Sequence, residues 1–273
     1  MGALTGEAPA AAIVALLGLA TLLGLCDLAF HPRTWQLRRP GMALRAQSAA
    51  AALLAGVLVV GILAIAVWGE SARVAPQAHP WLGVLPTVTF AAALFVAGGA
   101  LGIIAGRREV LSRGDVDVDR TIRTLIALSE RQQRRGDLTI SYIDAAHPFA
   151  CAVRVDGPHV LITSGLRRHL THAQIEAIVA HEAHHLTAGH DRHLRRARLA
   201  AACLPVVTAC RRHERRVRLL IELASDDHAA RHCGAVTTAQ ALESYQLAAP
   251  TPGTTERARR LRDSMHPASS GSR

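Results

Sequence analysis

Residues 181–185 read His-Glu-Ala-His-His, which is an H-E-x-x-H motif. On a helix, positions i and i+4 lie on the same face, so His181 and His185 can place two imidazoles on one metal ion. Glu182 lies beside that face and can accept a proton from a water molecule. This combination is typical of zinc hydrolases. It predicts one zinc ion per chain, bound by His181 and His185, with Glu182 as the general base.

The residues before the motif predict the helix that this geometry needs. Ile175, Ile178 and Val179 are spaced as on one face of a helix rather than alternating as in a strand. Thr171 is suited to the N-cap position, with Gln174 three residues later as its partner in a capping box. The motif is therefore expected inside a helix that begins near Thr171.

A catalytic zinc site usually has a third protein ligand, and Glu222 is the best candidate. It lies in an apolar helical run, where an unpaired carboxylate is costly to bury. Asp226 follows one turn later on the same face and is expected to hydrogen-bond a ligating histidine. The alternative for Glu222 is a solvated ion pair with Arg218. Four other side chains compete for the role of third ligand: His190, His193, Glu214 and Asp227.

The metzincin type of zinc site is excluded by spacing. That class has a glycine three residues, and a third histidine six residues, after the second histidine of the motif. In this chain those positions hold Ala188 and Asp191.

Composition indicates a membrane protein with a soluble portion. Half of the residues are hydrophobic, only 3% are aromatic, and the mean hydropathy is +0.20. A helix that crosses a bilayer needs about 20 apolar residues. Three runs have that length, and they predict three transmembrane helices at residues 10–30, 49–68 and 81–104.

We therefore expect a mainly α-helical membrane protein in three parts. A membrane domain (1–105) precedes a cytoplasmic α+β gluzincin-like metallopeptidase domain with a small sheet or hairpin (106–248), and a flexible polar tail follows (249–273). Arginines crowd the first connection between the apolar runs and the chain after the third run, which predicts an N-terminus outside the cell and a catalytic domain in the cytoplasm.

The net charge of +10 comes entirely from arginine, because the chain contains no lysine. No nucleic-acid-binding motif accompanies the charge, so we predict no nucleic-acid partner. Many of the arginines flank the apolar runs, where contact with anionic lipid headgroups is expected.

The region before the motif is expected to combine a helix with strands. Residues 118–134 predict an amphipathic helix, and residues 138–143 alternate like a strand. Residues 151–155 and 159–163 predict a hairpin, joined by Asp156-Gly157, a pair suited to positive φ in a tight turn. A strand beside the motif helix could bind an extended substrate by strand addition, or it could be purely structural.

The apolar stretch at residues 199–210 is too short to span a bilayer. We expect a helix that packs on the domain or dips into the cytoplasmic leaflet.

Several of these segments together resemble a known family. The chain resembles membrane-integrated zinc endopeptidases of the BlaR/MecR type, with HtpX-type and CAAX prenyl endopeptidases as related groups, over about residues 105–265. The matching segments are Pro148-Phe149-Ala150, the hairpin, Thr163-Ser164-Gly165-Leu166, Leu170-Thr171 and the run Ala177 to His185. The resemblance implies that His181, His185 and Glu222 bind zinc, that Glu182 is the general base, and that Asp226 supports a ligand.

One position departs from the HtpX-type pattern. Those enzymes commonly carry an arginine directly after the supporting aspartate, whereas this chain has Asp227. His228 or Arg231 could stabilise the transition state instead, with solvated helix residues as the alternative.

The expected function is that of a membrane-bound zinc endopeptidase acting on a protein or peptide at the cytoplasmic membrane face. Regulatory cleavage of a repressor is one such role. A membrane-protein quality-control peptidase of the HtpX type and a non-catalytic metal-binding scaffold or sensor are the alternatives. The sequence gives no indication of oligomeric state.

Overall fold

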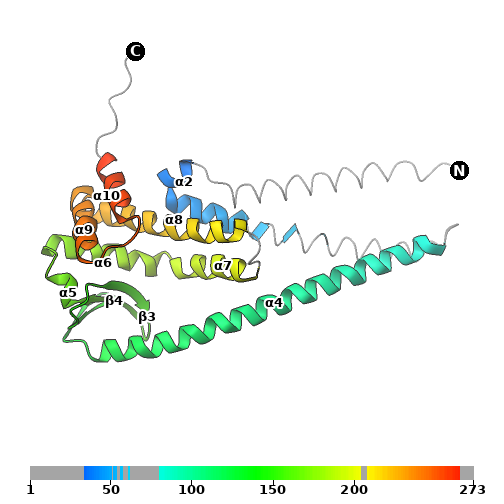
Figure 1. The fold of residues 1–273 in the computed structure, drawn as a ribbon, viewed down its shortest axis with the longest axis horizontal. Coiled ribbons are helices and arrows are strands. Elements are labelled where there is room, and N and C mark those ends of the chain that lie inside the picture. Colours follow the sequence, from blue (N-terminus) through cyan, green and yellow to red (C-terminus); the bar gives the residue numbers. More distant parts are fainter. Residues whose placement is uncertain are drawn as a thin grey trace, which may run out of the picture.

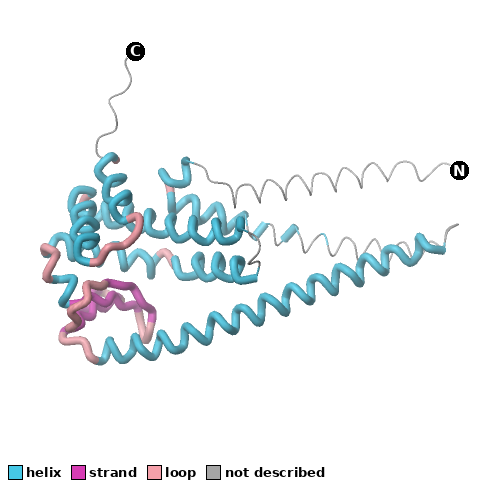
Figure 2. Tube along the Cα trace, viewed as in Figure 1, coloured by secondary structure: helices cyan, strands magenta, loops and turns pink. Residues whose placement is uncertain are grey.

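The computed structural model describes residues 34–50, a few positions between 52 and 61, residues 80–203 and residues 208–264. In this part of the chain, helices surround one small sheet (Figures 1 and 2). Most of the predicted span at 49–68 and all of the predicted span at 10–30 lie outside the described residues.

The sheet consists of β1 (Arg131–Arg135), β2 (Leu138–Ile143), β3 (Ala150–Arg154) and β4 (Pro158–Thr163). The strand order is β1-β2-β4-β3, so β3 lies at an edge. β2 and β4 are parallel, and the two outer pairs are antiparallel.

The predicted strand at 138–143 and the predicted hairpin are confirmed by the structure. Asp156 has a φ of 55° and Gly157 a φ of 133°, as the tight turn between β3 and β4 requires. Ile140, Val160 and Ile162 on the central strands are almost fully buried beneath the motif helix.

That helix is α6 (His172–Thr187), and it begins with the predicted capping box. The Thr171 hydroxyl accepts from the backbone N–H of Gln174, and the Gln174 side chain accepts from the backbone N–H of Thr171. Two orphan N–H groups at the helix start are thereby satisfied. Ala177, Ile178 and Val179 are buried in a core that α6 shares with the sheet and with α9 (Ala235–Ala248), and this packing sets the direction of the helix's histidines.

Four further helices pack with α6 or with one another in the described part of the chain. They are α7 (His190–Cys203), α8 (Thr208–Cys233), α9 (Ala235–Ala248) and α10 (Thr254–Asp263). α8 lies along α6 on the side away from the sheet, while α9 and α10 pack at one end of this pair (Figure 1). Residues 199–210 are expected from the sequence to pack on the domain. Those that the structure describes, 199–203 and 208–210, belong to α7 and α8, and these two helices contact each other.

α10 lies within the stretch that the sequence assigns to a polar tail. Its side chains Ala258 and Leu261 are buried against Ala239 and Leu242 of α9. The helix is strongly amphipathic, and its polar residues outnumber its apolar ones. Because the segment is polar on average, its hydrophobicity alone does not predict that it packs on α9.

α4 (Pro80–Ala127) is a single helix of 48 residues that runs past the sheet (Figure 1). The predicted helix at 118–134 is therefore correct only in its first part. α4 ends at Ala127, and residues 131–135 form strand β1, because their backbone pairs with β2 from Tyr142 to Leu138.

The prediction of three transmembrane helices is wrong for the part of the chain that the structure describes. No helix there combines the length and the apolar composition needed to cross a membrane. The prediction relied on the length of apolar runs, and the third run, at 81–104, belongs to α4, which continues into the charged residues that follow.

The helical segment at residues 34–50 packs on α8 as well. α2 (Thr34–Arg38) is followed by helical residues 40–50, whose Ala43 and Leu44 are buried against Val217 and Leu220 of α8. This contact supports α8 from the side opposite the motif helix.

Candidate metal centre

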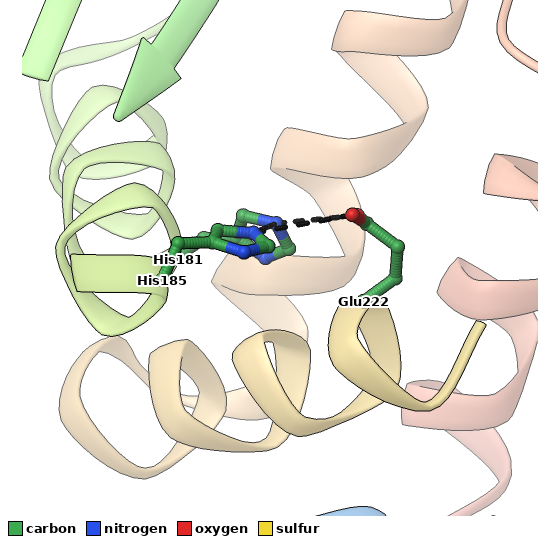
Figure 3. Close-up of side chains that lie close together, drawn as sticks. All are labelled: His181, His185 and Glu222. Carbon is green, nitrogen blue, oxygen red and sulfur yellow. Dashed lines mark hydrogen bonds and ion pairs between the residues drawn. The ribbon is translucent and has the colours of Figure 1, made fainter. Parts of the chain in front are cut away.

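The structure brings together the two motif histidines and the predicted third ligand. One ligand atom each of His181, His185 and Glu222 lies within 4.8 Å of the others, an arrangement that could hold a metal ion. The histidines project from α6 toward Glu222 on α8 (Figure 3). The Nε2 atoms of the histidines lie 3.2 Å apart, and His181 Nε2 lies 3.5 Å from Glu222 Oε2. His185 Nε2 lies 4.0 Å from Glu222 Oε1.

These distances fit a tetrahedral zinc site. Two nitrogens at about 2.05 Å from one tetrahedral ion are separated by roughly 3.3 Å, close to the observed 3.2 Å. His181 Nδ1 lies 3.0 Å from Asp226 Oδ1, and since a carboxylate only accepts, Nδ1 carries the proton. When the imidazole is neutral, its Nε2 lone pair is directed toward His185 Nε2 and Glu222, where a metal ion could accept it.

The buried carboxylates at the centre favour a positive charge beside them. Burial alone lowers the pKa of His181, but hydrogen bonds to Asp226 and Glu222 outweigh burial and raise the pKa to about 9. Burial likewise opposes ionisation of Glu222, but the hydrogen bond to His181 and the charge of Arg257 lower its pKa to about 2. Burial and the charge of His181 lower the pKa of His185 to about 4, which leaves this imidazole neutral and free to coordinate.

Glu182 is on the motif helix, and its side chain points toward the edge strand β3. Burial raises the pKa of its carboxyl group to about 7, and a backbone hydrogen bond from Ala152 on β3 partly opposes this shift. A carboxyl group with a pKa near neutrality can both accept and return a proton at physiological pH.

Asp226 is fully buried and lies where the sequence places it, against His181. A carboxylate on the second ring nitrogen fixes the tautomer and the orientation of a metal-binding histidine. Asp226 therefore directs the Nε2 atom of His181 at the centre.

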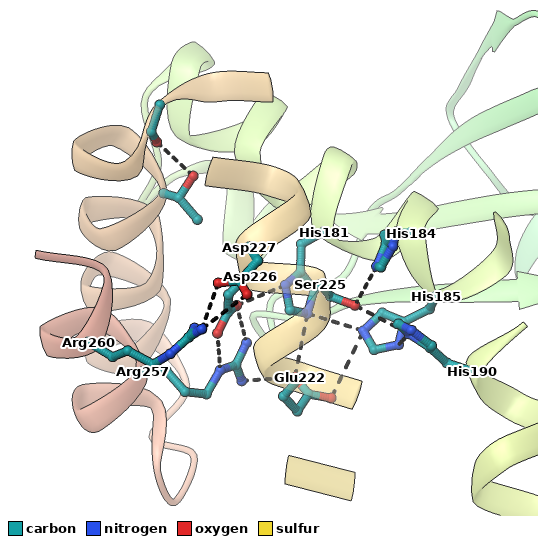
Figure 4. A network of polar contacts seen from close by, with 12 residues as sticks. His181, His184, His185, His190, Glu222, Ser225, Asp226, Asp227, Arg257 and Arg260 are labelled. Atoms are coloured by element: carbon teal, nitrogen blue, oxygen red, sulfur yellow. Dashed lines mark hydrogen bonds and ion pairs between the residues drawn. The ribbon is translucent and has the colours of Figure 1, made fainter. Parts of the chain in front are cut away.

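Arg257 is the important residue that the sequence analysis missed. Its guanidinium donates to Asp226 at 2.6 and 2.7 Å and lies 2.9 Å from Glu222 Oε2 (Figure 4). It therefore holds both carboxylates in place and balances their charge. Arg257 lies on α10, 31 residues after Asp226, in an arginine-rich segment with no local signal that singles it out.

His190, one of the competing ligands, lies behind His185 rather than beside the other ligands. Its Nδ1 lies 3.2 Å from His185 Nδ1 and 3.4 Å from the hydroxyl of the buried Ser225. Burial lowers the pKa of His190 to about 3. A neutral His190 can accept a hydrogen bond from the Nδ1–H group of His185. The Nε2 atom of His185 would then carry the lone pair and be free to bind a metal (Figure 4).

The other three competing ligands have partners elsewhere. His193 Nδ1 lies 3.1 Å from the hydroxyl of Ser48, and Glu214 pairs with Arg218 at 3.1 Å. The Arg218 side chain therefore pairs with Glu214 and not with Glu222. Asp227 pairs with Arg260 of α10 at 2.8 Å, so the residue that departs from the HtpX-type pattern has a structural partner (Figure 4).

His228 and Arg231 do not line the cleft in front of the centre as far as the structure describes it. His228 stacks on His184, and Arg231 is exposed on α8. Their prediction as transition-state stabilisers gains no support from this placement.

The centre opens into a cleft of about 670 Å³. Its lining includes residues 151–154 of β3, Val155 after the strand, Leu194 of α7 and Ile122 of α4. His181, Glu182, His185 and Glu222 all line this cleft, so the motif faces a space large enough for a peptide segment.

The comparison with protein families gives one match. Residues 112–216 match peptidase family M48. The M48-like segment runs from α4 through the sheet and α6 into α8, and it contains the whole H-E-x-x-H motif. Glu222, Asp226 and Arg257 lie beyond it, so their assignment rests on the geometry. Neither the curated proteins nor the solved structures contain a match to the chain.

Proposed function

We propose that this chain is a zinc-dependent endopeptidase. The observation that carries the proposal is the convergence of His181, His185 and Glu222 on one point, with Glu182 beside it in an open cleft. The M48-like segment supports the same reaction, because peptidases of this family are generally zinc-dependent.

The donor set fits zinc better than a hard cation such as magnesium. Two imidazole nitrogens and one carboxylate form the ligand set of gluzincin-type catalytic zinc sites and leave a fourth position open. When bound there, zinc supplies Lewis acidity, which acidifies water and polarises a carbonyl group.

The chain's own residues supply the proton transfers. Glu182 accepts a proton from the attacking water and delivers it to the leaving amine, a double role that a pKa near 7 permits. Asp226 and His190 hold the histidine rings in orientation, while Arg257 keeps Glu222 and Asp226 ionised.

The edge strand β3 offers a backbone to an extended substrate. The carbonyl of Phe149 accepts from the Thr163 N–H at 3.0 Å, so in the antiparallel pair Phe149, Cys151 and Val153 bond to β4. The alternate residues, Ala150, Ala152 and Arg154, then direct their backbone groups away from β4, where Ala150 contacts Tyr245 and Ala152 contacts Glu182. A peptide that pairs with this edge by strand addition would pass Glu182, which the backbone of Ala152 already contacts.

The substrate class that follows is a protein with an accessible extended segment. A cleft with an extended strand along one wall can take the middle of a chain, which favours an endopeptidase over an exopeptidase. Three further points stay predictions: cleavage of a repressor, a role in membrane quality control, and a location at the cytoplasmic membrane face. The specific resemblance to the BlaR/MecR type also stays a prediction.

The test is cleavage of an unfolded protein such as reduced casein by zinc-loaded protein. We expect cleavage that a chelator removes and added zinc restores. Glu182→Gln should retain zinc and fold while losing cleavage, because the amide cannot accept the proton. Undiminished cleavage by Glu182→Gln would refute the role of Glu182, and absence of wild-type cleavage on any unfolded protein would refute the proposal.

A further inference from the structure

A second group of histidines lies beside the metal centre and has no role in the proposed reaction. It consists of His184 on α6 and of His228 and His232 on α8. His228 and His232 are four residues apart on one helix, the same spacing that places His181 and His185 on one face. We call these three residues the outer histidines.

The three rings are in direct contact. The ring centroids of His184 and His228 lie 4.3 Å apart, and those of His228 and His232 lie 4.2 Å apart. His228 is half-buried and His232 is exposed, so the group opens to solvent on one side. An ion can therefore reach it without passing through the catalytic cleft.

One hydrogen bond identifies a free ligand atom. His232 Nδ1 lies 2.9 Å from the backbone carbonyl of His228. A carbonyl only accepts, so Nδ1 carries the proton and the lone pair of the neutral ring is on Nε2. A proton donated to a backbone carbonyl in this way is the usual second contact of a metal-binding histidine.

His184 has a comparable arrangement. Its Nδ1 lies 3.3 Å from the Ser225 hydroxyl, the same hydroxyl that contacts His190 (Figure 4). Its Nε2 has no hydrogen-bond partner among the described residues. No described ion pair joins any of the outer histidines to a carboxylate, so the donor set is nitrogen alone.

We propose that the outer histidines form a second metal site, separate from the catalytic centre, for a borderline transition-metal ion such as Zn²⁺. Imidazole nitrogen suits zinc, nickel and copper, whereas calcium and magnesium prefer oxygen. The rings are stacked in this structure, unlike the catalytic ligands, whose atoms already converge. Binding would require the stacked rings to turn, so that the His228 and His232 nitrogens, which the i, i+4 spacing places on one face, meet at one ion, and His184 would supply the third ligand.

The experiment is a titration of Zn²⁺ into the purified full-length protein, followed by calorimetry, after its resident zinc content has been measured. We expect wild type to take up one further equivalent of Zn²⁺. His232→Gln and His228→Gln should each lose this uptake while keeping the resident metal. His232 is exposed, so the first variant tests the site without disturbing the core.

The matched control is His172→Gln, which changes an exposed histidine, 89% accessible in its side chain, at the start of α6. It should bind the further equivalent as wild type does. The proposal is overturned if wild type takes up no further Zn²⁺, or if His232→Gln and His228→Gln take it up with unchanged affinity. The readout needs no peptidase activity, so the second site and the proposed function can fail independently.

Discussion

Arg257 donates two hydrogen bonds to the fully buried carboxylate of Asp226, from Nε to Oδ2 at 2.7 Å and from Nη2 to Oδ1 at 2.6 Å. A third contact, from Nη1 to Glu222 at 2.9 Å, ties the same guanidinium to the proposed zinc ligand. One side chain of α10 thus organises two carboxylates of α8. The position of the metal centre depends on a helix that lies outside the M48-like segment.

The first prediction concerns removal of this arginine. Arg257→Gln leaves two carboxylates without their counter-charge, so we expect a loss of about 3 kcal/mol in the free energy of unfolding and weaker zinc binding. Urea denaturation and a chelator competition measure the two effects. Arg259→Gln, on the exposed face of the same helix, is the matched control and should change neither. Equal stability of the Arg257 and Arg259 variants would contradict the assigned role.

The second prediction concerns His190 as the partner of His185. His190→Ala removes the acceptor for the His185 Nδ1 proton, so we expect zinc affinity to fall about 10- to 100-fold, as for other residues that orient a metal ligand. Competition with a chromogenic chelator gives the affinity. His193→Ala, whose partner is Ser48, should leave it unchanged. Complete loss of zinc in His190→Ala would instead indicate that His190 is itself a ligand.

The third prediction is a pH dependence of stability. Arg135 on β1 contacts both carboxylate oxygens of Glu176 on α6, with Nη2 2.8 Å from Oε1, and this hydrogen bond lowers the pKa of Glu176. A carboxyl group with a lowered folded-state pKa contributes stability above its unfolded-state value, and that contribution is lost as the pH falls through the folded-state value.

Glu176→Gln should therefore cost about 1 kcal/mol at pH 7 for a partly exposed pair, and the difference from wild type should shrink below about pH 4. Thermal or urea unfolding across this range measures it. Asp137→Asn, at the exposed turn between β1 and β2, serves as the control. A difference that stays constant down to pH 3 would show that the pair does not act through the Glu176 charge.

The fourth prediction concerns Gly165, which lies in the short helix α5 (Ser164–Arg167) after β4 and packs against the loop that leads into β3. A Cβ atom on Gly165 would lie 2.1 Å from the carbonyl oxygen of Ala146, and the Gly165 N–H donates to Ala145 at 2.9 Å. Gly165→Ala should cost about 1–3 kcal/mol, because the crowded backbone has to shift. Gly102→Ala in α4 meets nothing within 4 Å and should not destabilise. Equal unfolding midpoints for the two variants would refute the close approach.

Features that depend on neighbouring residues could be predicted from the sequence. The capping box of Thr171 and Gln174 and the positive φ of Asp156 and Gly157 are local properties, and the structure confirms them. The meeting of His181 and His185 on one face follows from helical spacing alone. Glu222 could be proposed because a carboxylate in an apolar helix needs a partner.

Features that depend on distant partners could not be predicted in this way. Residues 131–135 contain only arginine and glutamine, and they become strand β1 only because β2 supplies the hydrogen bonds. Arg257 and His190 look like ordinary polar residues of their helices until the tertiary fold places them against Asp226 and His185. The length of the apolar runs suggested membrane spans, which the described helices do not support.

The most direct test of the central claim is the zinc content of purified protein after loosely bound metal has been removed. Wild type is compared with His185→Ala, Glu222→Ala and the control Glu214→Ala, which changes a carboxylate paired with Arg218. We predict one tightly bound zinc per chain in wild type and in the control, and its loss in both ligand variants. Zinc retained by Glu222→Ala, or no zinc in wild type after reconstitution, would contradict the three-residue centre.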